Sequence, residues 1–309
     1  MVKRRNKWLV ERASITAKVR AFFSERDFLE VETPLLVPSP GLDVHLDAFE
    51  IASDQAARYL STSPEYQMKR LLAEGYERIV QVCKCFRQGE RGGRHNPEFT
   101  MVEWYRSQSG VESVIADTEV LVRTLTNGRV HILDDDLVVD TASPFLRMTV
   151  ATAFSRYAAT AEDEMLRLAE HDEDRYFRLF VENVEPALER FTQPVFLTDY
   201  PKTQASLARE KPTDDRYAER FELYLGGVEL CNGFGELTDA SEQRKRLVRD
   251  QQTRRSSGLP VYPIDERFLS SVAALPPCAG NALGLDRLVA LACGTREIAR
   301  VLAFSIDEL

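Results

Sequence analysis

The chain has 309 residues, of which 44% are apolar and 29% charged, and this composition predicts a globular fold of one large or two ordinary domains. The formal net charge of −9 argues against a general nucleic-acid binder, because such proteins usually present a basic surface. The basic start MVKRRNKWLVERAS lacks the apolar core of a secretion signal, and no apolar run is long enough to cross a membrane. We therefore expect a cytoplasmic protein without membrane partners.

The five cysteines are scattered and form no Cys-x-x-Cys pair, so we expect free thiols in a reducing compartment. Only four histidines occur, which argues against a histidine-rich metal centre.

At the N-terminus, an apolar stripe of Ile15, Val19, Phe22 and Phe23 predicts a helix over residues 11–26. The alternating residues 28–33 predict a strand, which Pro34 ends. A strand stopped by proline suits either an ordinary sheet edge or a seam between two copies of the chain.

The next elements are a loop over residues 35–54, a short strand over 59–63 and a helix from Pro64 to about Ala73. Ser63 is the expected N-cap of this helix, and Glu65 in its first turn favours the helix dipole.

Residues 82–106 predict a strand, a polar glycine-rich loop and a second strand. On the second strand, Phe99, Glu103 and Tyr105 share one face, and Val102 and Trp104 share the other, which we expect to be core. An acid between aromatic rings beside an arginine-bearing loop indicates a pocket for a ligand with phosphate and amine groups. A solvent-exposed hairpin with a surface charge pair would show the same pattern.

The remaining elements follow from periodicity and turn residues. They are a helix over 111–125, a hairpin over 127–140, helices over 149–190 broken near 171–174, strands over 195–199, 221–225 and 227–230, a solvated basic helix over 239–258, and a last element over 281–292. We expect one domain over residues 1–309, with a helical insertion without chemical groups at about 107–194.

Two glutamates near the C-terminal half, Glu229 and Glu236, lie seven positions apart, so strict strand alternation places them on opposite faces. If both enter one site, the segment 232–235 must bulge or turn. The sequence contains no P-loop and no dinucleotide-binding fingerprint.

The segments FR…HNPEFTMVEWYR, GNALGLDRLV and FLEVETP resemble motifs 2, 3 and 1 of class II aminoacyl-tRNA synthetases, and TSPEYQMKRLL and ELCNGFGELTD resemble the lysyl branch. The resemblance implies an α+β fold, with a class II antiparallel sheet flanked by helices, in a homodimer. It covers the chain from about Glu11 to the C-terminus.

Within that branch the chain resembles short paralogues that modify a protein. Motif 1 begins almost at Met1, so we expect no anticodon-binding domain and no tRNA partner. Ala282 stands where the synthetase motif normally has glycine, which changes the wall of the amino-acid pocket. The resemblance implies ATP-dependent activation of (R)-β-lysine as an adenylate and its transfer to a lysine ε-amine of elongation factor P.

The resemblance also implies residue roles. Arg87 and Arg287 are the expected catalytic residues, because planar guanidinium groups pair with phosphate oxygens. The expected ATP-binding residues are Arg87, Gln88, Gly89, His95, Asn96, Phe99, Glu229, Leu230, Gly284 and Arg287, with Glu229 acting through Mg²⁺. The expected substrate-binding residues are Ser63, Pro64, Glu65, Glu103, Tyr105, Glu236 and Ala282.

The chain departs from motif 2 in one place. The usual pattern is Arg-x-Glu, and this chain has Arg87-Gln88-Gly89 with the acid at Glu90. Two other functions stay open: a truncated lysyl synthetase that charges tRNA or another carrier, and a catalytically silent lysine sensor. The presence of both Arg87 and Arg287 disfavours the sensor.

Overall fold

The computed structural model describes residues 2–52 and 56–309. The strands of its main sheet are β1 (Leu29–Glu30), β5 (Arg78–Phe86), β6 (Glu98–Ser107), β9 (Leu146–Thr149), β10 (Val195–Pro201), β11 (Glu210–Lys211), β12 (Asp214–Leu225), β13 (Val228–Gly235) and β14 (Cys278–Gly284). The smaller strands are β2 (Leu36–Val37), β3 (Glu50–Ile51), β4 (Arg58–Leu60), β7 (Arg129–Ile132) and β8 (Leu137–Asp140). The helices are α1 (Val2–Ser24), α2 (Glu65–Ala73), α3 (Val111–Leu125), α4 (Val150–Tyr157), α5 (Glu162–His171), α6 (Glu173–Leu179), α7 (Glu185–Leu188), α8 (Ala240–Ser256), α9 (Glu266–Val272) and α10 (Leu285–Ala292).

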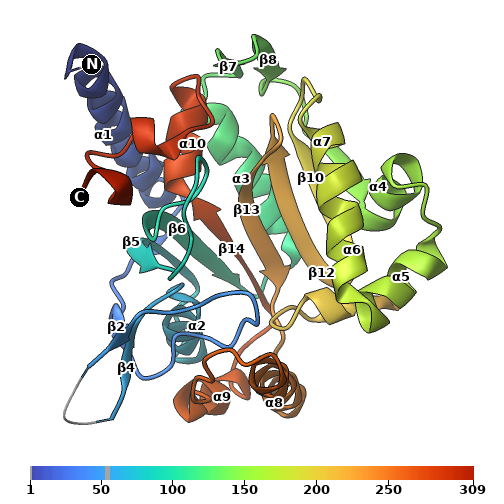
Figure 1. The fold of residues 1–309 in the computed structure, drawn as a ribbon. Helices are drawn as coiled ribbons and strands as arrows, with labels where there is room; N and C mark the ends of the chain where they lie inside the picture. The colour runs from blue at the N-terminus through green and yellow to red at the C-terminus, as the bar shows by residue number, and fades with distance from the viewer. Residues whose placement is uncertain (1, 53–55) are drawn as a thin grey trace.

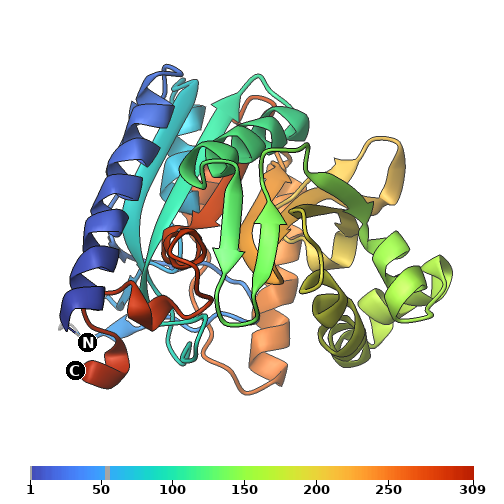
Figure 2. The same cartoon turned by 90° about the horizontal axis from the view of Figure 1, so that it is seen from above.

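The described part of the chain is organised around a nine-stranded sheet in the order β1-β5-β6-β14-β13-β12-β10-β9, with β11 beside β12 (Figure 1). The inner strands pair antiparallel, and the pairs at the two edges, β1 with β5 and β9 with β10, are parallel. The architecture is thus α+β, as the sequence predicts. The β7–β8 hairpin stands outside this sheet (Figure 2), where Leu133 N donates to Gly294 O just after α10.

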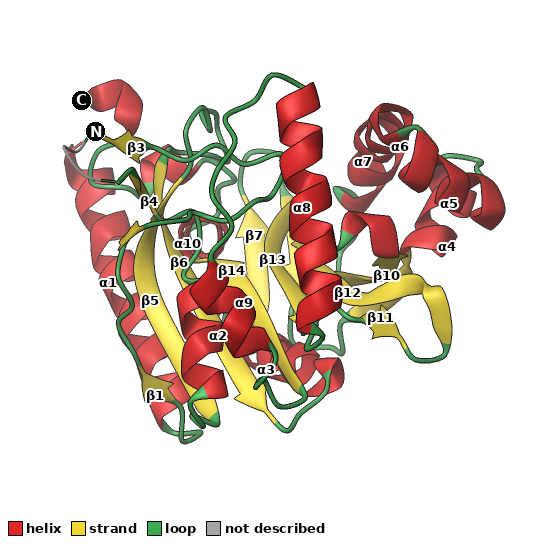
Figure 3. Cartoon of the chain, turned by 90° about the horizontal axis from the view of Figure 1, so that it is seen from below, coloured by secondary structure: helices red, strands yellow, loops and turns green. Residues whose placement is uncertain are grey.

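Helices cover both faces of the sheet. One apolar cluster joins α1, α3 and α10 to the sheet through residues such as Val102 and Trp104. A second cluster, which contains Tyr105 of β6, joins α2, α8 and α9 to the opposite face. Figure 3 shows these three helices over that face of the sheet. The two clusters therefore confirm the predicted alternation along β6. A third cluster packs α4–α7 against β10 and β12.

Predictions that rest on local periodicity are confirmed. The stripe of Ile15, Val19, Phe22 and Phe23 is buried, although α1 begins earlier than residue 11. Helix α3 has the predicted bounds, the 127–140 hairpin forms, and the long helical stretch breaks at Asp172. The five cysteines, all in the described part of the chain, are free.

Two predicted elements are wrong. Residues 281–292 are two elements, because residues up to Gly284 extend β14 between β6 and β13, and only the rest is helix. Helix α8 is not a solvated face: Gln243, Leu247 and Arg254 are almost fully buried. Gln243 Nε2 donates to Ser206 O and Arg254 donates to carbonyl groups of residues 43–46, partners in distant loops that a helical charge pattern does not reveal.

The interval 107–194 contains helices, the β7–β8 hairpin and strand β9, which continues the main sheet beside β10. Among the described residues, the model contains no helix that is both long enough and apolar enough to span a bilayer.

Candidate active site

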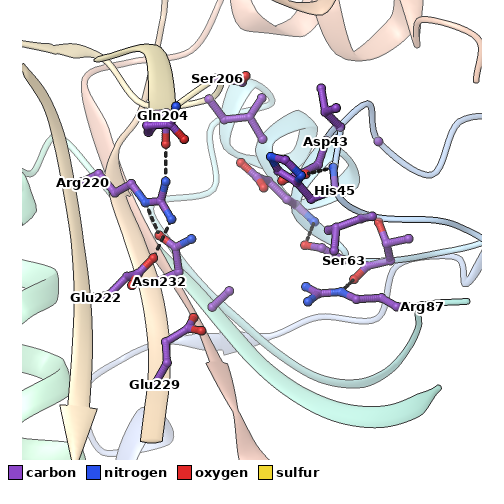
Figure 4. A pocket seen from close by; sticks show the side chains of 18 of the residues that line it. Asp43, His45, Ser63, Arg87, Gln204, Ser206, Arg220, Glu222, Glu229 and Asn232 are labelled. Atoms are coloured by element: carbon purple, nitrogen blue, oxygen red, sulfur yellow. Dashed lines mark hydrogen bonds and ion pairs between the residues drawn. The ribbon is translucent and has the colours of Figure 1, made fainter. Parts of the chain in front are cut away.

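A cavity of about 1240 Å³ opens on the face of the sheet that α2 and α8 border. Its walls come from strands β6 and β12–β14, from the loop between β2 and β3 and from helices α2, α5, α6, α8 and α10. Figure 4 shows Arg220, Glu222, Glu229 and Asn232 on one side of this cavity and His45, Ser63 and Arg87 on the other. The lining contains more acidic than basic side chains, so its charge favours cationic ligands.

At one end of the cavity, the first turn of α10 presents Arg287. Its Nη1 donates to Glu229 O at 2.8 Å and lies 3.3 Å from Glu229 Oε2, and its Nη2 lies 2.8 Å from His95 Nε2. Because a guanidinium can only donate, His95 Nε2 must be the acceptor. Burial, and then the charge of Arg287, lower the pKa of His95, so the ring stays neutral and can accept.

Arg87 directly follows β5 and lines the same cavity as Arg287. Its Nε donates to Thr62 O at 3.4 Å, and its guanidinium lies 5.0 Å from the centre of the Phe99 ring. Two guanidinium groups and an aromatic ring thus line one end, which suits a nucleotide.

The other end of the cavity is built on buried carboxylates. Lys69 Nζ, on α2, lies 2.6 Å from Glu65 Oε1 and 2.6 Å from Glu236 Oε2, and its side chain is 1% exposed. Beside it, Glu103 accepts hydrogen bonds from Ser63 Oγ at 2.8 Å and from Tyr105 Oη at 2.5 Å.

These carboxyl groups have perturbed acidities. Burial, and then the charge of Glu65, raise the pKa of Glu103 to about 8. Burial also raises the pKa of Glu236 to about 7, although Lys69 opposes the shift. Buried acids that hold protons near neutral pH can exchange them for a bound ammonium group, so this end suits an amine.

Backbone geometry brings these acids together. In the β12–β13 ladder, Leu223 faces Cys231 and Tyr224 faces Glu229, so Leu230 is an extra residue. This bulge reverses the alternation, so Glu229 lies on the same strand face as Asn232 and Phe234. Glu236 is the next position on that face after Phe234. The prediction of a bulge was right, but its place at 232–235 was wrong.

A glycine on β14 lets two side chains of the amine end approach each other. A Cβ on Gly280 would lie 2.2 Å from Tyr105 Cε1 and 2.9 Å from Glu236 Oε1. The position therefore admits only a residue without a side chain.

Comparison with known proteins decides the family. The model of the tRNA synthetases class II (D, K and N) matches residues 2–308. The chain belongs to this class II synthetase family. Curated relatives include proteins named elongation factor P–(R)-β-lysine ligase from Salmonella dublin, Salmonella paratyphi B and Salmonella heidelberg. Each is 40% identical to this chain, over 97% of the chain and 95% of the relative.

Most residues singled out by the class II resemblance lie together. Those that line the cavity are Ser63, Glu65, Arg87, His95, Asn96, Phe99, Glu229, Leu230, Ala282, Gly284 and Arg287. Glu103, Tyr105 and Glu236 are buried directly beneath its amine end. Pro64, Gln88 and Gly89 are not among the lining residues. Ser63 does act at the start of α2, since Glu65 N donates to Ser63 Oγ at 3.1 Å, although Pro64 occupies the N-cap position.

The departure from class II motif 2 takes a definite form. Gly89 has a φ of +83° and lies outside the cavity lining. Glu90 lines the cavity instead, with Oε1 3.4 Å from Arg87 Nη1. The carboxylate beside Arg87 is therefore supplied by Glu90.

Sequence reasoning missed a second polar cluster on β12. Glu222 accepts hydrogen bonds from Tyr200 Oη at 2.6 Å, Tyr224 Oη at 2.7 Å and Arg220 Nη2 at 2.5 Å. Arg220 Nε also donates to Asn232 Oδ1 at 3.2 Å. The signal was the alternation of Arg220, Glu222 and Tyr224 along one strand face.

The helices of the 107–194 interval also line the cavity, which their charge-rich sequence did not indicate. Glu173 and Phe177 of α6 contact His45 from the loop between β2 and β3: His45 Nε2 lies 3.8 Å from Glu173 Oε1, and the rings of His45 and Phe177 are in edge contact. Helices α5 and α6 thus line the cavity, although we expected no chemical groups in the helices over residues 149–190.

No group of three or more His, Cys, Asp or Glu side chains in the described residues could hold a metal by itself. Magnesium usually takes one or two carboxylates and completes its shell with substrate phosphates. Glu229 fits that requirement: burial, and then the charge of Glu222, raise its pKa, so a nearby cation would stabilise its ionised form.

Proposed function

We propose that this chain activates (R)-β-lysine with ATP as an adenylate and transfers it to the ε-amine of a lysine on elongation factor P. The observation that carries the proposal is the 40% identity, over nearly all of both chains, to ligases of that name. The cavity supports it because arginines at one end suit phosphates and carboxylates at the other suit amines.

In the first step, an oxygen of the amino-acid carboxylate attacks the α-phosphorus of ATP, and pyrophosphate leaves. Arg87 and Arg287 would hold the phosphates and stabilise the charge on their oxygens, while Phe99 would stack on adenine. In the second step, the acceptor amine attacks the carbonyl carbon of the adenylate, and AMP leaves with the bonding electron pair.

The substrate amines would meet the carboxylate end. Ser63, Glu65 and Ala282 line it, and Glu103, Tyr105 and Glu236 lie beneath. Glu229, with Glu222 behind it, would hold Mg²⁺ against the phosphates, where the ion would neutralise negative charge.

We further propose that the working unit is a homodimer that does not need tRNA. Leu29 on the edge strand β1, and Leu35 and Leu36 at the start of β2, are 50%, 37% and 50% exposed, and a second copy would cover them. The net charge of −9 disfavours a polyanionic partner. Light scattering should give twice the chain mass, and the double variant Leu29→Glu/Leu36→Glu should give the monomer mass; a monomeric wild type would refute the dimer.

The deciding experiment incubates purified protein with ATP, Mg²⁺, elongation factor P and either β-lysine or α-lysine, and then measures the mass of elongation factor P. We expect a mass increase of one lysyl residue, larger in extent with β-lysine. No increase with β-lysine would sink the proposal. A parallel reaction with lysine tRNA tests the synthetase alternative, which aminoacylation of that tRNA would favour.

A further inference from the structure

The most constrained charged group of the amine end is Lys69. Its side chain is 1% exposed, and its Nζ lies 2.6 Å from oxygens of both Glu65 and Glu236. A buried ammonium costs several kcal/mol of desolvation unless it is well paired, so the two contacts are what permit its position.

Lys69 joins two parts of the site that the sequence separates widely. Glu65 is one helical turn away on α2 and lines the cavity, whereas Glu236 follows β13 and is fully buried. Glu236 N also donates to Cys278 O at 3.0 Å, which fixes its backbone. Lys69 therefore sets where both carboxylates stand relative to the cavity.

We propose that Lys69 is a positioning residue: it holds Glu65 and Glu236 at the end of the cavity and favours the ionised form of Glu236, and it thereby sets the pH range in which the diamine substrate binds. This inference rests on the proposed function. Without Lys69, the carboxylate of Glu65 would repel that of Glu236 in a buried site, and Glu236 would take up a proton rather than keep its charge. A protonated carboxyl group no longer attracts an ammonium group electrostatically.

Several other titratable or charged groups face this cluster. They are Tyr66 on α2, Glu103 and Tyr105 on β6, Cys278 on β14, Asp250 on α8 and Arg209 before β11. Burial raises the pKa of Tyr66, Tyr105 and Cys278, so these groups stay neutral at physiological pH.

Two charges oppose each other on Glu236. The coulombic effect of Lys69 lowers the pKa of Glu236, while the charge of Glu65 raises it. Burial lowers the pKa of Lys69, but Glu236 and Glu65 outweigh burial and raise it above its ordinary value. Lys69 is therefore charged throughout the physiological pH range. Of the charged groups in this cluster, only the acids can lose protons when the substrate binds.

The test compares Lys69→Met, Lys69→Arg and the control Arg70→Met. Arg70 is the next residue on α2; it is not among the lining residues of the cavity, and it makes no ion pair with Glu65 or Glu236 but donates to Gln67 Oε1. Pyrophosphate exchange is measured from pH 6 to pH 9 with β-lysine, and kcat/KM for the amino acid is followed. In the wild type we expect kcat/KM to rise with pH as the acids ionise.

We expect Lys69→Met to move this rise upward by at least about one pH unit and to raise KM for the amino acid about tenfold at pH 7, because the acids lose their counter-charge. KM for ATP should change by less than about threefold, since the nucleotide binds at the other end. Lys69→Arg keeps the charge and should retain the wild-type pH profile, and Arg70→Met should match the wild type. An unmoved profile in Lys69→Met, or equal increases in both KM values, would overturn the inference.

A second measurement needs no variant. Calorimetric titration of lysine into the wild type at pH 7, in two buffers with different heats of ionisation, reports protons released on binding. We expect release, and a heat independent of the buffer overturns the inference even if Lys69→Met does not fold. Absence of pyrophosphate exchange with either lysine isomer in the wild type would instead refute the proposed function.

Discussion

At the scale of single residues, the two cavity arginines are held differently. Arg287 donates to Glu229 O at 2.8 Å and lies 2.8 Å from His95 Nε2, so its guanidinium is fixed before any ligand arrives. Arg87 makes only longer contacts, at 3.4 Å, to Thr62 O and Glu90 Oε1. Prearranged donors stabilise developing charge without reorganisation, so Arg287 is the better placed of the two for catalysis.

Arg287→Ala should therefore reduce ATP–pyrophosphate exchange by at least about 10²-fold, the usual cost of losing one prearranged donor. The fold should survive, because the guanidinium lies at the cavity surface and not in an apolar cluster. Arg300→Ala is the control, since Arg300 pairs with the exposed Glu297 outside the cavity lining. Normal exchange in Arg287→Ala would refute its role.

Ala282 is the residue that should distinguish lysine isomers. It lines the cavity and is paired with Glu103 on β6 and Asn232 on β13, so its methyl group lies between these two residues. Ala282→Gly should improve kcat/KM for α-lysine relative to β-lysine by about tenfold, a typical value for one carbon in a pocket. Ala279→Gly, in the apolar core of the same strand, should leave the ratio unchanged. An unchanged ratio in Ala282→Gly would remove the role of the methyl group.

At the scale of elements, α8 holds in place the loop between β2 and β3, which forms one side of the cavity. Arg254 is fully buried, and its guanidinium donates to Asp43 O, Val44 O, Leu46 O and Pro260 O and to the Asp47 carboxylate. Asp47 O in turn accepts from Gln88 N at 2.7 Å, so the motif 2 loop is tied to α8 through one arginine.

Arg254→Met should lower the free energy of unfolding by about 3 kcal/mol or more, because several buried acceptors lose their donor at once. KM for ATP should rise, since the loop that carries Arg87 loses its support. Arg255→Met, at the exposed neighbouring position, should change stability by less than about 0.5 kcal/mol. Chemical denaturation measures both, and equal stabilities would contradict this account of α8.

Local elements could be predicted from the sequence because their causes are local. The stripe of α1 and the alternation along β6 follow from the spacing of apolar residues, and the structure buries both as expected. The burial of Arg254 could not be predicted, because all its acceptors except Pro260 O lie about 210 residues away. The same holds for the bulge at Leu230, which depends on the register between β12 and β13.

At the scale of the whole molecule, the cavity is assembled from segments distant in sequence. The motifs predicted a part of its lining, since eleven of the predicted residues line it. The part of the cavity wall around His45 could not be predicted. His45 contacts Glu173 and Phe177, so the loop between β2 and β3 meets α6, and neither segment carries a motif. Lys69 and Glu236 likewise meet only through the fold.

The acids of the amine end should make global stability depend on pH. The folded-state pKa of Glu103, about 8, and that of Glu236, about 7, both exceed the value of 4.5 for an unperturbed glutamate. Between these limits the folded chain binds more protons than the unfolded chain, so stability falls as pH rises, by up to about 1.4 kcal/mol per pH unit per proton.

Glu103→Gln should make this fall shallower between pH 5 and pH 8, because glutamine reproduces the neutral acid and does not titrate. Urea denaturation at several pH values measures the slope. Glu98→Gln, at the exposed start of the same strand, should keep the wild-type slope. A slope unaffected by Glu103→Gln would mean that Glu103 is already ionised in the folded chain.

The backbone at Gly89 has a consequence for protein design and for transferring residue roles along an alignment column. Its φ of +83° is a conformation that side chains other than glycine rarely adopt, and a Cβ built there meets nothing within 4 Å. Grafting the family's usual glutamate onto this column would strain the turn and direct the new side chain into open space. The acidic residue of the motif stands one position later, at 90 and not at 89, so Glu90 is the position to vary when this loop is re-engineered.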